Sequence, residues 1–135
     1  MDTRFIDALA SSAPVPGGGG ASAYVGALAS ALASMVGNLT VGKKTYAEVE
    51  GEVKRRLAEL SRLRALLIEL VDEDARAFEP LAAAYRMPKG TPEEAAAKGA
   101  AVQAALVGAT EAPLSIMRAA AGVIEHADYL ARNGS

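Results

Sequence analysis

The chain has 135 residues, of which 51% are hydrophobic and only 4% aromatic, and its net charge is −2. This length corresponds to one domain, and the small acidic charge, with basic and acidic residues interleaved, argues against nucleic acid as a partner. Cysteine is absent and there is one histidine, which excludes disulfides, thiolate zinc sites and histidine-rich metal centres.

The N-terminal segment predicts a short helix followed by a loop. Asp2 or Thr3 can cap the helix, and residues 11–20 form the loop. The segment contains acidic residues and no long apolar core, so it does not resemble a signal peptide. We therefore expect a cytoplasmic protein.

A proline- and glycine-rich loop precedes the second helix. Pro14 and Pro16 keep the chain extended, and four glycines at 17–20 free the backbone to adopt positive φ and leave its N–H groups uncovered. A helix that begins near Ala21 directs its unpaired N–H groups and its positive dipole end at the same spot, which suits a carboxylate, a carbonyl or a phosphate. The alternative is a tight turn that lets two helices pack closely. The spacing matches neither nucleotide-binding glycine motif.

The second helix is expected at about Ala21 to Val41, in a stretch without charge from Ala8 through Gly42. Its larger apolar residues recur at steps of three and four, which predicts a buried stripe: Val25, Leu28, Leu32, Met35 or Val36, and Leu39. Small residues form a second, flat face that another backbone can approach: Gly26, Ser30, Ala33 and Gly37. The run is long enough to span a bilayer, but it contains Asn38 and Thr40 and has no aromatic belt. A helix buried in a bundle is preferred, with no membrane partner.

A long third helix is predicted at about Thr45 to Tyr85. It has an apolar stripe opposite a charged, solvated face. Pro80 should kink this helix or end it early, because proline lacks the N–H that the helix needs.

The sequence after residue 90 predicts a helix that begins at a capping box and is interrupted at a proline. Thr91 and Glu94 form a capping box, with proline at the first helical position between them. This helix should reach about Thr110, and Pro113 should kink or restart it toward Leu130. No segment alternates with a period of two, so we expect no sheet. The fold class expected for residues 1–135 is a single all-α, up-and-down, multi-helix bundle.

One acidic residue of the third helix falls on its apolar face. With Leu60 set at 0° and steps of about 100° per residue, Asp74 falls at about −40°, in the middle of the stripe. Asp72 falls at about +120°, off the stripe. An aspartate that faces a core must be paired, hydrogen-bonded or protonated. Asp74 is therefore either a structural acceptor for a neighbouring helix end or a general acid/base in a pocket.

Three further polar positions have both structural and functional interpretations. Lys43 and Lys44 close the second helix, where they complement its dipole as solvated charges or contact an anion. Asn38, if buried, would line a pocket or join helices through its amide. His126 lies away from the apolar face of its helix, so a surface or interface position is preferred over a catalytic base.

The sequence resembles the cyclodeaminase domain of formiminotransferase-cyclodeaminase and the bacterial cyclodeaminase and methenyltetrahydrofolate cyclohydrolase proteins. The resemblance is carried by FIDALASSAPVPGGGGASA at 5–23, SMVGNLTVGKKTY at 34–46, LVDEDARAFEPLAAAYRMPKGTPEE at 70–94 and APLSIMRAAAGVIEHA at 112–127. It covers nearly the whole chain in order. The family's domains continue past the position of Asn133 with a further long helix, which this sequence lacks.

The resemblance implies an all-helical homodimer, or higher homo-oligomer, that acts on a tetrahydrofolate derivative in one-carbon metabolism without a metal or other cofactor. It places the catalytic carboxylate in the DEDA segment, where helix phase prefers Asp74 over Asp72. It makes the glycine loop the folate-binding element. With the polar positions considered above, the residues predicted for substrate binding are Pro16, Gly17, Gly18, Gly19, Gly20, Ser22, Asn38, Lys43 and Lys44. The glycines would hold the pteridine or benzoyl–glutamate region, and the lysines the carboxylates of the glutamate tail.

Two reactions fit this resemblance. A cyclodeaminase joins N10 of 5-formiminotetrahydrofolate to the formimino carbon and expels ammonia, whereas a cyclohydrolase opens 5,10-methenyltetrahydrofolate with water to give 10-formyltetrahydrofolate. Both pass through an aminal and need proton transfer, which one carboxyl group could serve. The alternative is a non-catalytic helical dimerisation module or an inactive, truncated homologue.

Overall fold

The computed structural model describes residues 3–135, and Asp2, one of the two predicted caps, lies outside them. Within these residues the chain is helical and contains no strand, as predicted. The elements are α1 (Arg4–Leu9), α2 (Gly18–Thr40), the short 3₁₀ helix η1 (Lys44–Tyr46), α3 (Glu50–Tyr85), α4 (Pro92–Ala109) and α5 (Glu111–Asn133).

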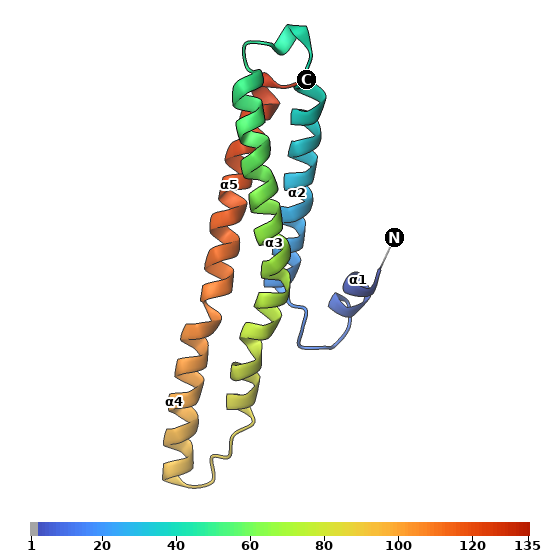
Figure 1. Ribbon diagram of the computed structural model, residues 1–135. Helices are drawn as coiled ribbons and strands as arrows, with labels where there is room; N and C mark the ends of the chain where they lie inside the picture. The colour runs from blue at the N-terminus through green and yellow to red at the C-terminus, as the bar shows by residue number, and fades with distance from the viewer. Residues whose placement is uncertain (1–2) are drawn as a thin grey trace.

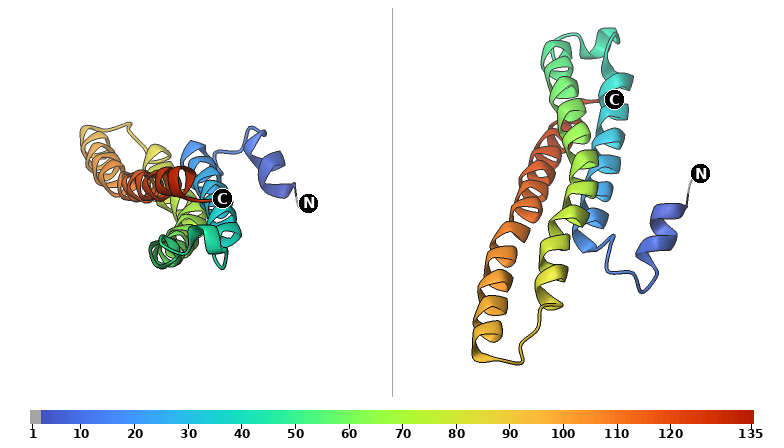
Figure 2. Two further views of the ribbon diagram at one scale, coloured as in Figure 1. Left: turned by 90° about the horizontal axis from the view of Figure 1, so that it is seen from above. Right: turned by 60° about the horizontal axis from the view of Figure 1, so that its bottom comes forward.

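Three helices, α2, α3 and α5, form a bundle that Figure 2 shows from its end. α2 and α3 run antiparallel and share the most extensive contact (Figure 1). α4 packs along the second half of α3 and leads into α5 after a break at Thr110. α1 lies outside the three-helix bundle, beside α2, which it contacts through the rings of Phe5 and Tyr24 (Figure 1). The chain therefore follows the predicted up-and-down course.

The hydrophobic core lies between these three helices. The apolar stripe of α3 supplies many of its large side chains, as the sequence period predicts: Val53, Leu60, Leu63, Leu67 and Leu70. α5 adds Ile116, Val123 and Leu130, whereas α2 adds mainly alanines. Burial of one such large aliphatic side chain is worth about 1.5–3 kcal/mol, so α3 and α5 contribute most of the apolar stabilisation.

The predicted burial of the large apolar residues of α2 is wrong, whereas the predicted close approach at its small-residue face is confirmed. Its large apolar residues are between 51% and 64% exposed: Val25, Leu28, Leu32, Met35 and Leu39. The small-residue face is buried against α3 instead, where a Cβ added at Gly26 or Gly37 would come within 3.2 Å or 2.7 Å of a leucine side chain. Small residues let the two helices approach closely, so the flat face takes the contact and the larger residues remain outside.

Among residues 3–135, two helical stretches are long and apolar enough to cross a membrane by length and composition alone. They are Gly18–Thr40, whose most apolar window is 33% buried, and Pro92–Asn133, whose window is 11% buried. The core helix of a soluble protein passes the same test. The buried small-residue face of α2 places this helix in the bundle.

The helix ends follow local chemical signals. The predicted capping box begins α4: the Glu94 N–H donates to Thr91 Oγ1 at 3.1 Å, and the Thr91 N–H donates to the Glu94 carboxylate at 3.2 Å. Gly42, just after α2, has a φ of 81° and is the one residue with positive φ in the described part of the chain. A glycine adopts this conformation without a steric penalty.

Pro80 does not end α3 early, contrary to one of its two predicted effects. The helix continues through it to Tyr85. The proline removes the N–H that would pair with the Arg76 carbonyl. Both Arg76 and Pro80 are exposed, so water can satisfy that carbonyl.

Candidate active site at the first turn of α2

Asp74 of α3 is half-buried and contacts the first turn of α2. Its Oδ2 accepts a hydrogen bond from the Gly20 N–H at 2.9 Å. This N–H belongs to the first turn of the helix, where the positive end of the dipole favours a negatively charged carboxylate. The position agrees with the helix phase read from the sequence, which places Asp74 on the packed face of α3.

The glycine run does not adopt the positive φ that the sequence suggested. Gly17 is extended, with φ −108° and ψ −167°, and α2 begins at Gly18, three residues before the predicted start at Ala21. No residue of the run has positive φ. The prediction of positive φ is therefore wrong: Gly18, Gly19 and Gly20 continue the helix, and another element comes close at Gly19 and Gly20.

The close approach of α3 explains why residues 19 and 20 are glycines. A Cβ at Gly19 would overlap the carboxylate of Asp74, and a Cβ at Gly20 would lie 3.4 Å from the Val71 carbonyl oxygen. At Gly18 no atom lies within 4 Å of such a Cβ. The absence of a side chain at residue 19 therefore allows the aspartate to reach the helix end.

A small pocket of about 110 Å³ opens beside Asp74. Its walls come from the proline–glycine loop, α3 and the end of α4, and apart from the carboxylate they are apolar: Pro14, Val15, Gly17, Ala77, Phe78 and Ala109. The Val15–Pro16 peptide bond beside this pocket is cis. A carboxylate that is hydrogen-bonded through one oxygen and lines an apolar pocket has surroundings typical of an acid/base group.

A larger apolar groove of about 670 Å³ adjoins this pocket at Ala77. It lies between α4 and the second half of α3, and its walls are almost entirely small residues: Ala77, Pro80, Ala83, Ala84, Met87, Ala101, Ala104, Ala105 and Gly108. Sequence reasoning missed this groove. Alanine occurs on every side of α4, so its pattern indicates no preferred face.

Asp72 has different surroundings from Asp74. It is exposed and lines a hollow of about 350 Å³ with Phe5, Tyr24, Ile68 and Val71, where α1 meets α2 and α3. Its carboxylate has no hydrogen bond or ion pair within residues 3–135. The two candidate aspartates, Asp72 and Asp74, therefore line separate cavities.

The remaining predicted binding residues are spread along α2. Ser22 lies in the first turn, where its hydroxyl donates to the Gly18 carbonyl at 2.7 Å. Asn38 is exposed near the other end of the helix, away from the buried small-residue face, so its predicted burial is wrong. Lys43 and Lys44 follow that same end. A helix of 23 residues is about 33 Å long, so these lysines lie far from the glycine loop of their own chain.

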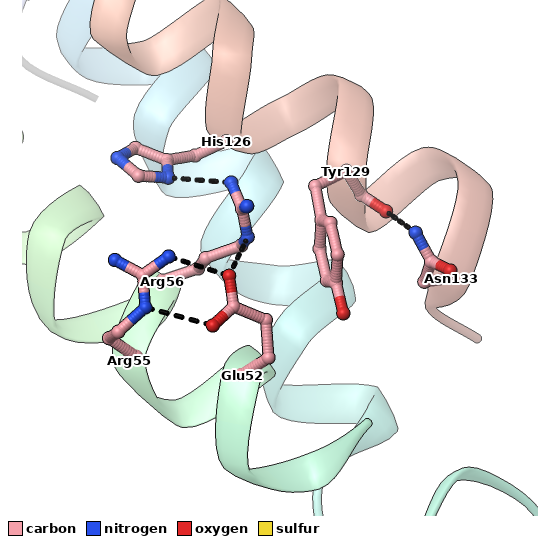
Figure 3. A network of polar contacts seen from close by, with 6 residues as sticks. All are labelled: Glu52, Arg55, Arg56, His126, Tyr129 and Asn133. Carbon is pink, nitrogen blue, oxygen red and sulfur yellow. Dashed lines mark hydrogen bonds and ion pairs between the residues drawn. The ribbon is translucent and has the colours of Figure 1, made fainter. Parts of the chain in front are cut away.

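A polar cluster joins α3 to α5 near the lysine end of the molecule (Figure 3). The Nε of Arg56 lies 2.8 Å from a carboxylate oxygen of Glu52. The Nη1 of Arg56 donates to the Nδ1 of His126 at 3.2 Å. The guanidinium also lies 3.9 Å from the centre of the Tyr129 ring. Hydrogen bonds from Arg55 and the charges of both arginines lower the pKa of Glu52 to about 2.

This cluster places His126 between α3 and α5, at an interface between helices, where the sequence leaves a surface or an interface position open. Sequence reasoning missed Arg56, because an arginine is the residue type expected on a solvated face and its partners on α5 are remote in sequence. In the part of the chain that the structure describes, no three histidine, aspartate or glutamate side chains are arranged to hold a metal ion.

Comparison with known proteins identifies the family. Residues 2–135 match the family described as Formiminotransferase-cyclodeaminase. The chain is 48% identical over 131 residues to a methenyltetrahydrofolate cyclohydrolase of Methylorubrum extorquens, covering 97% of this chain and 63% of that relative. It is 38% identical over 112 residues to the formimidoyltransferase-cyclodeaminase of Mus musculus, covering 83% of this chain and 21% of that relative.

A solved structure shows the same fold. The crystal structure of formiminotetrahydrofolate cyclodeaminase from Thermotoga maritima matches with a TM-score of 0.83 and 33% identity, over 100% of this chain and 64% of that one. The chain thus spans less than two thirds of the length of both bacterial relatives. The sequence match and the shared helical architecture establish that this chain belongs to the formiminotransferase-cyclodeaminase family.

Proposed function

We propose that this protein acts on the one-carbon unit of a tetrahydrofolate derivative, as a methenyltetrahydrofolate cyclohydrolase or a formiminotetrahydrofolate cyclodeaminase. The observation that carries the proposal is the Asp74 carboxylate, which accepts the Gly20 N–H at 2.9 Å and lines an otherwise apolar pocket. The names of the relatives support it, since one at 48% identity is a cyclohydrolase and one at 33% identity is a cyclodeaminase.

In the cyclohydrolase reaction Asp74 would act first as a base and then as an acid. Water adds to the methenyl carbon of the cationic substrate while the carboxylate takes one water proton, which leaves a neutral carbinolamine. The bond from this carbon to N5 then breaks, N5 takes the proton from the carboxyl group, and the hydroxyl proton passes to solvent. The carbon remains on N10 as a formyl group.

The cyclodeaminase reaction needs the same two proton transfers. N10 attacks the carbon of the protonated formimino group, the electron pair of the C=N bond moves onto the formimino nitrogen to make it an amino group, and N10 gives its proton to Asp74. The product of this step is a neutral tetrahedral aminal. The carboxyl group then protonates the amino nitrogen, ammonia leaves, and the methenyl bridge between N5 and N10 is complete. One carboxyl group in one pocket can therefore serve either reaction.

The loop and the groove would supply the substrate contacts. Backbone N–H groups of the first turn of α2 have no helical partner and suit a carbonyl or carboxylate of the ligand. The apolar groove of about 670 Å³ next to the Asp74 pocket suits the flat, apolar middle of a folate.

We further infer that the protein forms a homodimer through α2. Five large apolar side chains on this helix, from Val25 to Leu39, are more than half exposed. Soluble monomers rarely leave a contiguous apolar surface of this kind open to water. A second copy of the chain would cover it.

Turnover of the two candidate substrates tests the proposed function. With 5,10-methenyltetrahydrofolate, we expect loss of the near-ultraviolet absorbance of the methenyl group if the protein is a cyclohydrolase. With 5-formiminotetrahydrofolate, we expect gain of that absorbance and release of ammonia if it is a cyclodeaminase. The absence of both reactions, together with the absence of stabilisation by 5-formyltetrahydrofolate, would contradict the proposal.

A non-catalytic dimerisation module is the second candidate, and the exposed apolar face of α2 favours it. A ligand-binding measurement distinguishes the folate enzyme from the dimerisation module. A folate at a hundredfold excess over its dissociation constant should stabilise the folded enzyme by about 2.7 kcal/mol. A dimer whose unfolding is unaffected by any tetrahydrofolate derivative would support the module instead.

A further inference from the structure

An aromatic ring stands beside the carboxylate in the Asp74 pocket. Phe78 follows Asp74 by four residues on α3, so the two side chains are neighbours on one face of this helix. Both line the pocket of about 110 Å³, and no other aromatic residue among those described lines it. The ring is partly buried. The pocket thus combines one carboxylate with one aromatic ring.

The charges around this pocket favour a cation. Among the described residues that line it, Asp74 is the one with a charge, and none is a lysine, an arginine or a histidine. The positive end of the α2 dipole, equivalent to about +0.5 of a charge, acts against a cation, but the full negative charge of the carboxylate exceeds it. Oδ2 of Asp74 accepts the Gly20 N–H, and Oδ1 has no hydrogen bond or ion pair within residues 3–135. One carboxylate oxygen therefore remains for a positively charged ligand.

The pocket has room for one ring of a ligand. Sites that enclose a drug-sized molecule measure about 300–1,000 Å³, whereas this pocket measures about 110 Å³. The five-membered ring that carries a one-carbon unit would fit between Asp74 and Phe78. The rest of the ligand would extend out of the pocket, along the groove that adjoins it at Ala77.

We propose, on the basis of the proposed function, that Phe78 and Asp74 together select the cationic, amidinium form of the one-carbon unit, which lies between the aromatic ring and the carboxylate. In 5,10-methenyltetrahydrofolate the positive charge is spread over N5, the methenyl carbon and N10. The protonated formimino group is an amidinium cation too. An aromatic face attracts such a cation through its quadrupole. Both candidate reactions therefore begin with a ligand of the class that this pocket suits.

This selection distinguishes substrate from product in the cyclohydrolase reaction. The formyl group of the product is a neutral amide, so its attraction to the ring and to the carboxylate is weaker once the five-membered ring has opened. The pocket would hold the substrate more tightly than the product, which favours product release. Phe78 binds the cation and takes no part in proton transfer, so loss of its ring should raise KM without lowering kcat.

A pair of ligands that differ in the charge of the one-carbon unit tests the proposal. This unit is cationic in 5,10-methenyltetrahydrofolate and neutral in 5-formyltetrahydrofolate. Phe78→Leu keeps an apolar side chain and removes the ring. The dissociation constant of the methenyl compound, measured by single-turnover kinetics, should rise about 3- to 30-fold, and that of the formyl compound should change less than about twofold. Equal weakening of both ligands would overturn the proposal, because the ring would then act only as apolar surface.

Fluorinated phenylalanines at residue 78 test the same contact with almost no change of shape. Each added fluorine withdraws negative charge from the face of the ring and weakens its attraction for a cation. The dissociation constant of the methenyl compound should rise stepwise with the number of fluorines, while that of the formyl compound stays level. The absence of this trend in folded protein, verified by circular dichroism, would overturn the proposal.

Phe5→Leu is the matched control. Phe5 is the other phenylalanine of the chain, and it lies against Tyr24 in the hollow that Asp72 lines. This variant should leave the ratio of the two dissociation constants unchanged. A change as large as that of Phe78→Leu would overturn the assignment to Phe78. If the wild-type chain neither turns over nor binds either compound, the proposed function fails, and the role of Phe78 fails with it. If the wild type is active but Phe78→Leu does not distinguish the two ligands, only the role of Phe78 fails.

Discussion

At the scale of single residues, the contact between Gly19 and Asp74 defines the candidate site. The carboxylate lies where a side chain at residue 19 would be, and it accepts the N–H of the next residue at 2.9 Å. Because residue 19 has no Cβ, the Asp74 carboxylate of α3 can reach the N-terminal end of α2. Substitution of this glycine is a direct way to disturb the aspartate without changing it.

Gly19→Ala should impair activity far more than Gly18→Ala. The added methyl group overlaps the Asp74 carboxylate, whereas at residue 18 it meets no atom within 4 Å. We expect loss of the hydrogen bond to Gly20, worth about 1.5–3 kcal/mol for a charged acceptor, and a fall in turnover on the order of 10²-fold. Urea unfolding and steady-state kinetics measure the two effects. Equal behaviour of both alanine variants would show that the close contact is unimportant.

Asp74→Asn should lower turnover on the order of 10²–10⁴-fold, because the amide can still accept the Gly20 N–H but cannot shuttle a proton. Asp72→Asn is the matched control, since Asp72 is exposed and lines a different cavity. The measurement is kcat with folded protein quantified by circular dichroism. A larger loss at Asp72 would reverse the assignment of the acid/base.

Glu52 should make stability depend on pH in the acid range. Its pKa is lowered from 4.5 to about 2, first by the hydrogen bonds from Arg55 and further by the charges of Arg55 and Arg56. A lowered folded-state pKa means that this contribution is complete above about pH 4.5 and is lost as the pH falls toward 2. The difference in melting temperature between wild type and Glu52→Gln should therefore shrink over this interval. A difference that stays constant from pH 5 to pH 2 would disprove this role.

At the scale of elements, α2 is the unusual helix. It buries its small residues and exposes its large ones, because α3 approaches so closely that leucine side chains at 57 and 67 occupy the space beside Gly37 and Gly26. The helix therefore has two faces with separate uses. One makes the closest contact within the bundle, and the other exposes its large apolar side chains within residues 3–135.

If the protein forms the proposed homodimer through α2, Leu32→Glu should separate it and leave the protomer folded. The side chain is 61% exposed within one protomer, so the charge costs little there, but in the proposed interface it would be buried without a partner. Sedimentation velocity should show a monomer, and circular dichroism should show an unchanged helix content. Ser61→Glu, on an exposed position of α3, is the control and should remain dimeric. A dimeric Leu32→Glu variant would place the interface elsewhere.

At the scale of the whole molecule, the bundle is open toward one end. α2 and α5 cover the first part of α3, but the second part of α3 has only α4 beside it (Figure 1). The small residues on these two helices leave the groove of about 670 Å³, which begins at the Asp74 pocket. An extended ligand could therefore lie in the groove with its reactive part at the carboxylate.

The sequence predicted the features that depend on neighbours along the chain. The all-helical class, the capping box at Thr91, the apolar stripe of α3 and the side of α3 that carries Asp74 are all present. Each follows from helical periodicity or from groups within one turn, which a single sequence contains.

Only the tertiary structure decided which face of α2 is buried and why the glycines are there. Both faces of α2 are uncharged, so burial of either is compatible with its sequence. The choice depends on how closely α3 can approach, which is a property of two helices together. Likewise, the need for glycine at residue 19 arises from Asp74, 55 residues later in the chain. A steric requirement between segments that far apart has no local pattern, so the sequence by itself determined the helices and the fold determined the site.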